Sequence, residues 1–326
     1  MKNVFFTDGR WQGKIPRNHV DIRNDSAWMH LLDAVHHPIY DYNNIRGFDN
    51  VFIMFPKGKL SITADATRAG NVPNPASELL RAPIVETLKQ YNDKVHYIQE
   101  GATWWFNDYE VEDQLLFYNF LFDCDSIFTH NEYDIKFYRG LFPNKKIRPI
   151  QTIMFDDGIK HITPTKEEKC IVGGNFARWY GGFQSFIVAQ EFNVPIWIPT
   201  SHAKRENEHN IDGVNHLPRL VWNDWMGELS KFKYAIHLMP TIAAGTFNLN
   251  CSYWGIPCIG HEKVDTQRLL HPDLAVDVDD VESAQKLAHK LVTDVDFYNH
   301  CSTKTKELYN IHYNPDNWLS SFMEKL

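Results

Sequence analysis

The sequence predicts an α/β protein made of two doubly wound domains, each built on a parallel sheet. Short apolar runs typical of buried strands alternate with longer runs at helical spacing along the whole chain. A polar segment at residues 156–169 separates two halves that both show this alternation. The length of 326 residues fits two domains of ordinary size. Strand–helix alternation gives parallel sheets with right-handed crossovers, so we expect domains over residues 1–160 and 168–313.

The first half contains five strand-like runs and four helix-like runs. Asp25 and Ser26 are suitable caps for a helix that Pro38 would stop, and Pro56 closes an apolar strand. The expected strands are residues 4–7, 50–55, 94–99, 126–129 and 147–153, and the expected helices are residues 25–36, 77–91, 112–121 and 133–141.

The second half repeats the pattern and ends in a helical tail. The expected strands are residues 170–172, 196–198, 219–222, 235–239 and 258–259. The expected helices are residues 182–192, 224–232 and 247–254, followed by 281–292, 296–309 and 316–326.

Composition excludes several classes of protein. With 43% hydrophobic and 23% charged residues the chain is not disordered, and no apolar stretch is long enough for a membrane span. The apolar run at residues 4–6 is too short for a signal peptide. The five cysteines are scattered, so we expect neither a disulfide framework nor a zinc site, and we expect a cytoplasmic protein.

Ligands of doubly wound sheets bind beyond the carboxyl ends of the strands, so the loops after strands are the candidate sites. The loop at residues 8–14 offers two glycines for close backbone approach and two cations for a phosphate or carboxylate. These residues are Gly9, Gly13, Arg10 and Lys14. The alternative is a loop with solvated charges.

Two further candidates follow the third and fourth strands. Glu100 lies close to Trp104 and Trp105, and a carboxylate beside aromatic rings suits a polyol. The alternative is an aromatic loop folded over the core. His130 follows the strand at residues 126–129 and is either catalytic or structural.

The second half has two small-residue loops that each open a helix. The loop at residues 173–182 contains Gly173, Gly174 and Arg178, and a glycine turn at a helix N-terminus suits a diphosphate. It matches neither GxxxxGK[ST] nor GxGxxG. The second loop precedes Gly245, Thr246, Phe247 and Asn248, whose amides would face an anion. Simple turns and close helix–sheet packing are the alternatives.

The order of these elements resembles that of the GT-B glycosyltransferases, specifically the retaining family with many bacterial nucleotide-sugar-dependent members. The segment at residues 250–259, NCSYWGIPCI, is similar to that family's EAmacGxPvI motif. The resemblance implies two Rossmann-like domains facing a cleft, with the C-terminal helix, residues 314–326, crossing back to the first domain. The family's paired acids, E-x7-E, fall on Ile242 and Asn250, so neither is acidic here.

The resemblance implies transfer of a hexose or pentose from a nucleotide sugar to a hydroxyl acceptor, without a metal ion or a permanently bound cofactor. A UDP-sugar is the favoured donor and would bind the second domain. Its base would lie near Val221 and Trp222, and Asn250 would replace the second acid as a neutral hydrogen-bonding group. The diphosphate would contact Gly173, Gly174, Arg178 and the amides of residues 245–248, with His202 and Lys204 in reach; Gly9 and Gly13 are further donor contacts.

The same resemblance assigns the acceptor to the first domain. Arg10, Lys14, Trp104 and Trp105 would contact the acceptor, and Glu100, His130 and Arg178 are the candidate catalytic residues. The chain also resembles phage glycosyltransferases that modify hydroxymethylated DNA bases, which would place it in the host cytoplasm. A local basic patch would be needed for DNA, since the net charge is −8.

Three other functions stay open at this point. The acceptor could be a surface polysaccharide or a lipid-linked saccharide. The chain could be a non-catalytic relative that binds a sugar or nucleotide, or a nucleotide-sugar epimerase that needs no acceptor. The sequence does not give the oligomeric state.

Overall fold

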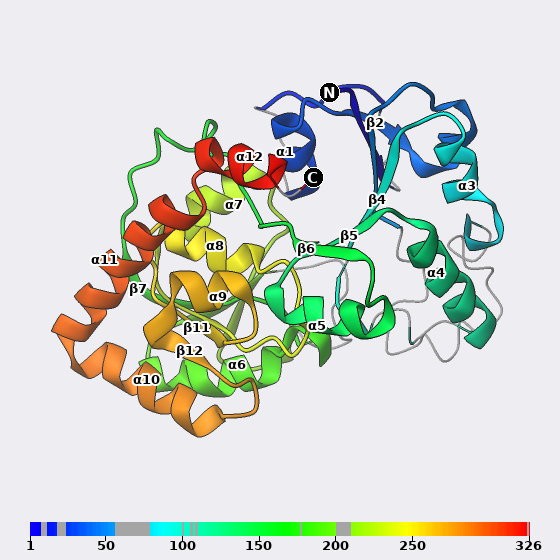
Figure 1. Cartoon of the computed structure of the whole chain (residues 1–326). Coiled ribbons are helices and arrows are strands. Elements are labelled where there is room, and N and C mark those ends of the chain that lie inside the picture. The colour runs from blue at the N-terminus through cyan, green and yellow to red at the C-terminus, as the bar shows by residue number, and fades with distance from the viewer. Residues whose placement is uncertain are drawn as a thin grey trace. The chain divides into compact units, whose positions relative to one another are not determined.

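A computed structural model describes the chain in two compact units (Figure 1). The described residues are 1–7, 12–17, 24–55, 79–99, 101–104, 107, 110–176, 178–199, 210–324 and 326. The first unit comprises Met1–Arg17, Asp25–Gln151 and Leu319–Leu326, and the second is built mainly from Thr152–Trp318. The chain therefore leaves the first unit after residue 151 and ends in it again.

The first unit contains a six-stranded sheet in which all paired strands are parallel, in the order β2-β1-β3-β4-β5-β6. The strands are β1 (Asn3–Thr7), β2 (Val35–Pro38), β3 (Asn50–Ile53), β4 (Lys94–Ile98), β5 (Ser126–Thr129) and β6 (Lys146–Pro149). Its helices are α1 (Asn24–Leu31), α3 (Ile84–Lys89), α4 (Val111–Asp123) and α5 (Glu132–Leu141), with the 3-10 turn η1 (Ile39–Asn44).

The inner strands β1, β3, β4 and β5 are mostly apolar on both faces, because both faces of the sheet are covered. Val4, Phe6 and Val51 point into one core with α3, α4 and α5. Alternate residues point the other way, where Phe52 lies between Phe5 and His96, with ring centroids 4.9 and 5.1 Å away. The last helix, α12 (Pro315–Met323), adds Phe322, whose ring is 5.0 Å from Phe128 and 6.2 Å from Phe52. This contact fixes the chain's end in the first unit.

The second unit contains another all-parallel sheet of six strands, in the order β12-β11-β10-β7-β8-β9. The strands are β7 (Glu167–Val172), β8 (Ile196–Pro199), β9 (Val214–Leu217), β10 (Phe232–His237), β11 (Cys258–His261) and β12 (Ala275–Val276). The helices are α6 (Gly182–Ala189), α7 (Trp222–Leu229), α8 (Thr246–Tyr253), α9 (Asp265–Leu270), α10 (Val281–Thr293) and α11 (Val295–His312). The 3-10 turns are η3 (Arg178–Tyr180), η4 (Gln190–Phe192) and η6 (Pro272–Leu274).

Helices pack on both faces of the second sheet too. Residues of α7, α8 and α9 join Ile171 and Ala235 in one core. On the other face, α6 and α10 pack against Val172 and Ile236, and they lie together in Figure 1.

Three expectations about local structure are wrong. The strand expected at residues 147–153 ends at Pro149. The run at residues 25–36 is not one helix: α1 ends at Leu31, and residues 35–38 form β2. This edge strand is specified by pairing with β1 and by a hydrogen bond of 2.8 Å between His36 Nε2 and Thr7 Oγ1. The predicted strand at residues 219–222 is also wrong. The strand of this region, β9, ends at Leu217, and α7 already begins at Trp222.

We predict that the free energy of unfolding falls steeply as the pH is lowered, because three buried histidines are neutral in the folded protein. Burial lowers the pKa of His96, His237 and His271 to about 4, against 6.5 for an ordinary histidine. The unfolded chain therefore binds protons at a higher pH than the folded chain, so the free energy of unfolding falls as the pH drops from 6.5 towards 4, by up to about 3 kcal/mol per histidine. Urea unfolding at a series of pH values measures this.

A His96→Asn variant provides the matched control. It should unfold with a shallower pH dependence than the wild type over that window, since one of the three groups is removed. Parallel curves for the two proteins would contradict the prediction for His96.

Candidate functional site

The order in which strands are added to the second sheet reverses between β7 and β10. From β7 the chain builds outward through β8 and β9, then returns to β10 on the other side of β7 and continues to β11 and β12. The two central strands pair in parallel, with Ala235 opposite Ile171 and Ile236 opposite Val172. The loops that follow them diverge to opposite faces, and ligands of doubly wound sheets bind at such a point. This is the candidate site.

Both loops end in a glycine that starts a helix. Gly181 precedes α6 with φ 63°, and Gly245 precedes α8 with φ 68°. Neither helix has a side-chain cap at its N-terminus. The first-turn amides of α6 and α8 therefore keep the partial positive charge that attracts anions.

The glycines are also required by the packing of the chain on itself. A Cβ atom at Gly181 would overlap the carbonyl oxygen of Leu238, and one at Gly245 would overlap Thr266 Oγ1. A Cβ at Gly182 would overlap the carbonyl of Asn175. The structural explanation for these glycines thus holds whatever the loops bind.

The two loops are bonded to one another at Leu238. Its N–H donates to Ser185 Oγ of α6 at 2.9 Å, while its carbonyl lies against Gly181. At the base of the first loop, the Gly173 N–H donates to the Ile236 carbonyl at 2.8 Å. The starts of the loops after β7 and β10 are therefore held in one fixed arrangement.

His237, the last residue of β10, lies directly under the first loop. A Cβ at Gly173 would be 2.5 Å from His237 Cγ and 2.6 Å from Phe247 Cδ1. The His237 side chain is buried, and its Nδ1 is 3.2 Å from Asn248 Oδ1. Sequence reasoning missed this residue, although a histidine inside an apolar strand is itself a signal of a buried polar contact.

A chain of hydrogen bonds determines which nitrogen of His237 carries the proton. Gln267 Nε2 donates to the carbonyls of Cys258 and Leu274, at 2.9 and 3.0 Å, so Gln267 Oε1 is an acceptor. It accepts from Asn248 Nδ2 at 2.5 Å, which leaves Asn248 Oδ1 to accept from His237 Nδ1–H. Because burial keeps this histidine neutral, its Nε2 has a lone pair, and that atom has no hydrogen-bond partner among the described residues.

The predicted contacts on α8 have different local roles. The side chain of Asn248 belongs to the network under β10, so only its backbone amide remains for a ligand. Asn250 is buried, and the amide orientation that satisfies its neighbours puts Oδ1 3.0 Å from Trp225 Nε1 and Nδ2 3.0 Å from the Thr246 carbonyl. Phe247 is buried with its ring centroid 5.1 Å from that of His237.

The other predicted residues of the second unit lie in two places, the loop after β7 and the start of α7. Gly173 and Gly174 are in the loop after β7, with Gly174 closely packed on Tyr180. Arg178 begins η3 in the same loop. Val221 is the exposed N-cap of α7, and Trp222 is its first residue, partly buried in the core.

In the first unit, the predicted residues occupy two places at the carboxyl edge of the sheet or near it. Gly13 exchanges backbone hydrogen bonds with His36 of β2, at 2.9 and 2.8 Å, and exposed Lys14 forms an ion pair with Asp33. Trp104 lies in a turn after β4. His130 follows β5, is buried, and stacks on Trp28 with centroids 5.8 Å apart.

Six predicted residues and one side chain lie outside the described part of the chain. The residues are Gly9, Arg10, Glu100, Trp105, His202 and Lys204; the side chain is that of Arg178. Their assignments stay predictions.

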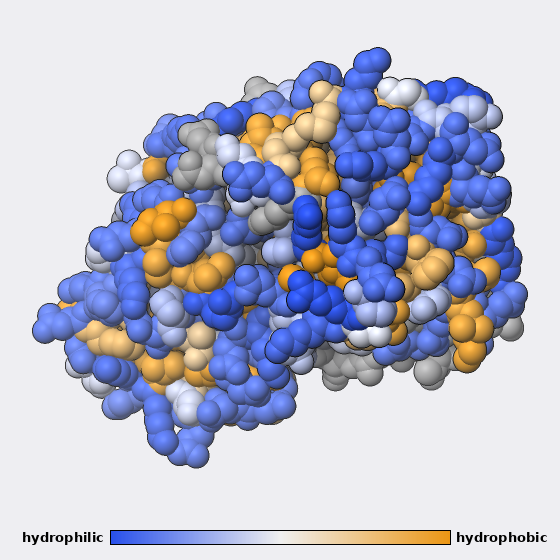
Figure 2. All heavy atoms as spheres, viewed as in Figure 1, coloured by the Kyte–Doolittle hydropathy of each residue, from blue (hydrophilic) through white to orange (hydrophobic). Residues whose placement is uncertain are grey.

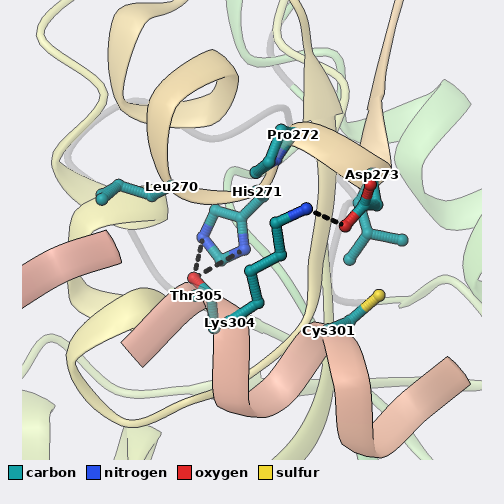
Figure 3. A pocket seen from close by; sticks show the side chains of 8 residues that line it. Leu270, His271, Pro272, Asp273, Cys301, Lys304 and Thr305 are labelled. Carbon is teal, nitrogen blue, oxygen red and sulfur yellow. Dashed lines mark hydrogen bonds and ion pairs between the residues drawn. The ribbon is translucent and has the colours of Figure 1, made fainter. Parts of the chain in front are cut away.

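One small cavity of the second unit is not a substrate site. It has a volume of about 10 Å³, enough for one water molecule, and lies between η6 and α11 near the amino end of β12 (Figure 3). Its polar groups are paired: Lys304 Nζ with Asp273 Oδ2 at 2.8 Å, and Thr305 Oγ1 with His271 Nδ1 at 3.1 Å. The described residues contain no group of three His, Cys, Asp or Glu side chains suited to a metal ion, and no helix among them is long and apolar enough to cross a membrane.

No family model and no curated protein sequence matches this chain, but solved structures do. An alpha-glucosyltransferase in complex with UDP and a 13-mer DNA containing an HMU base superposes with a TM-score of 0.59 at 13% identity, covering 99% of both chains. Sucrose-phosphate synthase from Thermosynechococcus elongatus gives a TM-score of 0.61 at 10% identity, covering 99% of this chain and 98% of that one. The chain has the GT-B fold.

A third similar structure is S. aureus TarM in complex with UDP and alpha-GlcNAc-glycerol, with a TM-score of 0.60 and 10% identity. It covers 88% of this chain, while this chain spans only 57% of TarM. At these identities the likeness concerns the fold, and the predicted GT-B architecture of two parallel-sheet units is confirmed.

We predict that Gly181→Ala costs about 3 kcal/mol of folding free energy, because alanine at this φ is strained and its Cβ overlaps the Leu238 carbonyl. Gly245→Ala should behave similarly. Urea unfolding measures both changes.

Gly213→Ala is the matched control. Gly213 has φ 80° with nothing within 4 Å of an added Cβ, so only the backbone strain of about 1 kcal/mol applies. Equal losses at positions 181 and 213 would contradict the inferred close contact between the two loops.

Proposed function

We propose that this protein is a glycosyltransferase that moves a sugar from a UDP-sugar to a hydroxyl acceptor. The observation that carries the proposal is the β7–β10 switch point, where α6 and α8 both begin at a glycine without a side-chain cap. Support comes from the similar GT-B structures that contain UDP, one of which covers 99% of this chain.

The second unit is the proposed donor domain. The diphosphate would bind the first-turn amides of α8, residues 245–248, and the loop at Gly173 and Gly174, with Arg178 as the cation. As the sugar–diphosphate bond breaks, negative charge grows on the leaving phosphate, and fixed amides stabilise that charge without reorganising. We propose that these groups act without a metal ion.

His237 is suited to a hydroxyl rather than to a phosphate. Its Nε2 offers a lone pair, which repels an anion and accepts a hydrogen bond from O–H. This atom is buried beneath the loop at Gly173, so a hydroxyl of the donor's ribose or sugar would reach it only if that loop moved aside.

The first unit is the proposed acceptor domain. His130 and Trp104 follow neighbouring strands β5 and β4, and Glu100 follows β4 in the sequence, so a carboxylate, an imidazole and an aromatic ring are available for a polyol acceptor. Arg10, Lys14 and Trp105 complete the proposed acceptor contacts.

Hydroxymethylated DNA is the acceptor that we favour. The support is the similar alpha-glucosyltransferase, which was solved with UDP and DNA and matches this chain over its full length. A glycan or lipid-linked saccharide is the second candidate, supported by the TarM structure with its alpha-GlcNAc-glycerol.

A radiolabelled UDP-sugar panel tests the function. A glycosyltransferase should release UDP slowly from its true donor and transfer the label to an acceptor. We expect label on hydroxymethylated DNA and none on unmodified DNA or a lipid extract. Tight nucleotide binding without UDP release from any sugar donor would instead identify a non-catalytic binding protein, and conversion of the sugar without an acceptor would identify an epimerase.

Arg178→Ala is predicted to lower kcat/KM by about a hundredfold or more, because removing one group that stabilises the leaving phosphate typically costs about 2.7–4 kcal/mol. Steady-state kinetics with the identified donor measure the change. Arg178→Lys keeps the charge but loses the bidentate geometry, so its kcat/KM should lie between that of the wild type and that of Arg178→Ala.

The unfolding midpoint of Arg178→Ala should equal that of the wild type. Near-normal turnover in a folded Arg178→Ala variant would remove Arg178 from the diphosphate site.

A further inference from the structure

One threonine of the second unit is buried with an unpaired hydroxyl. Polar side chains of folded proteins lie mostly at the surface, and hydrophilic residues cover much of the face shown in Figure 2. Thr241, in the loop after β10, is 8% exposed, and its Oγ1 is buried without a hydrogen-bond partner among the described residues. Such a hydroxyl costs stability, because the water that it bonded in the unfolded chain is lost. Folding alone therefore does not account for this side chain.

The loop that carries Thr241 connects the starts of two helices. Near its beginning, the Leu238 carbonyl lies against Gly181, where α6 starts, and Pro240 Cδ would be 2.9 Å from a Cβ atom at that glycine. At its end, Gly245 precedes α8. Thr241 follows Pro240 directly, so along the loop it lies between the N-termini of α6 and α8. Both N-termini lack a side-chain cap.

The loop and the helix that follows it contain no charged side chain. No Asp, Glu, Lys or Arg occurs from residue 234 to residue 252. An anion at the start of α8 would therefore be held by this segment through backbone amides and neutral donors. Because a phosphate oxygen only accepts hydrogen bonds, it would use the O–H of Thr241 as a donor.

Two other buried threonines show what the hydroxyl of Thr241 lacks. Thr152 Oγ1 donates to the Ala244 carbonyl, and Thr266 Oγ1 donates to the Gly245 carbonyl at 2.9 Å. These two bonds hold the chain in place just before α8. Thr241 has no corresponding carbonyl among the described residues, so its O–H remains available for a ligand.

We propose that Thr241 binds the diphosphate of the donor, with its Oγ1–H donating to a phosphate oxygen at the first turn of α8. The inference rests on the proposed function and adds a residue that the sequence did not predict. The ligand class is a nucleoside diphosphate. A hydrogen bond to this charged group would offset the cost of burying the hydroxyl.

Thr241→Val tests the inference, because valine keeps the shape of threonine without the hydroxyl. Two opposite effects are expected. The urea midpoint of the ligand-free protein should rise, since an unpaired buried polar group is replaced by an apolar one. The Kd for UDP, measured by isothermal titration calorimetry, should increase by at least about tenfold, since a hydrogen bond to a charged group is lost. Lower stability with unchanged UDP affinity would show a structural threonine and overturn the inference.

Two further variants serve as controls. Thr241→Ser keeps the hydroxyl and should retain UDP affinity to within about threefold. Thr305→Val changes a threonine of α11 that is 1% exposed and whose Oγ1 is 3.1 Å from His271 Nδ1. It should lower the urea midpoint and leave UDP affinity unchanged. Equal loss of UDP affinity in Thr241→Val and Thr305→Val would overturn the assignment.

Inorganic pyrophosphate identifies the part of the donor that Thr241 contacts. Thr241→Val should weaken pyrophosphate binding as it weakens UDP binding, and a loss confined to UDP would place the contact on the uridine and overturn the inference. Wild-type protein that binds no UDP would refute the proposed donor site and this inference together. UDP binding and release that are the same in Thr241→Val and the wild type would refute the inference alone.

Discussion

The close contact between the two loops that follow β7 and β10 is the constraint on which the candidate site depends. Leu238 donates its N–H to Ser185 on α6 and places its carbonyl where a side chain at position 181 would be. Only glycine fits there, and its left-handed backbone starts α6 without a side-chain cap. The same local requirement at Gly245 starts α8. Packing of the chain on itself thus leaves two helix N-termini uncapped at the switch point of the sheet.

Positions 242 and 250 carry no acidic side chain, so neither places a negative charge at the start of α8 or within it. Asn250 is neutral and bonds to Trp225 and Thr246, so it fixes α8 to α7. His237 is kept neutral by burial and oriented through Asn248 and Gln267 by two backbone carbonyls. These groups add no negative charge beside the α8 amides, which favours an anionic ligand in the proposed account.

The sequence predicted the two parallel sheets, and the structure shows why. Strands buried on both faces are mostly apolar, so the centres of β1, β3, β5 and β11 appear as short apolar runs, with buried polar residues such as Asn3, Asn50 and His261 at their ends. The edge strands were harder: β2 consists of Val35, two histidines and Pro38, and β9 contains Asn215 and His216, so pairing with a neighbour decides their conformation. The glycine turns could be predicted from the sequence. The roles of His237 and Gln267 could not, because their hydrogen bonds join residues that are distant in the sequence.

Amide hydrogen exchange with and without UDP measures the central claim most directly, since it reports on backbone N–H groups in the intact protein. If the switch point between β7 and β10 binds the diphosphate, exchange at residues 245–248 and in the first turn of α6 should slow by about tenfold or more when UDP is present. UDP that binds and protects only other segments, leaving these amides unchanged, would contradict the account.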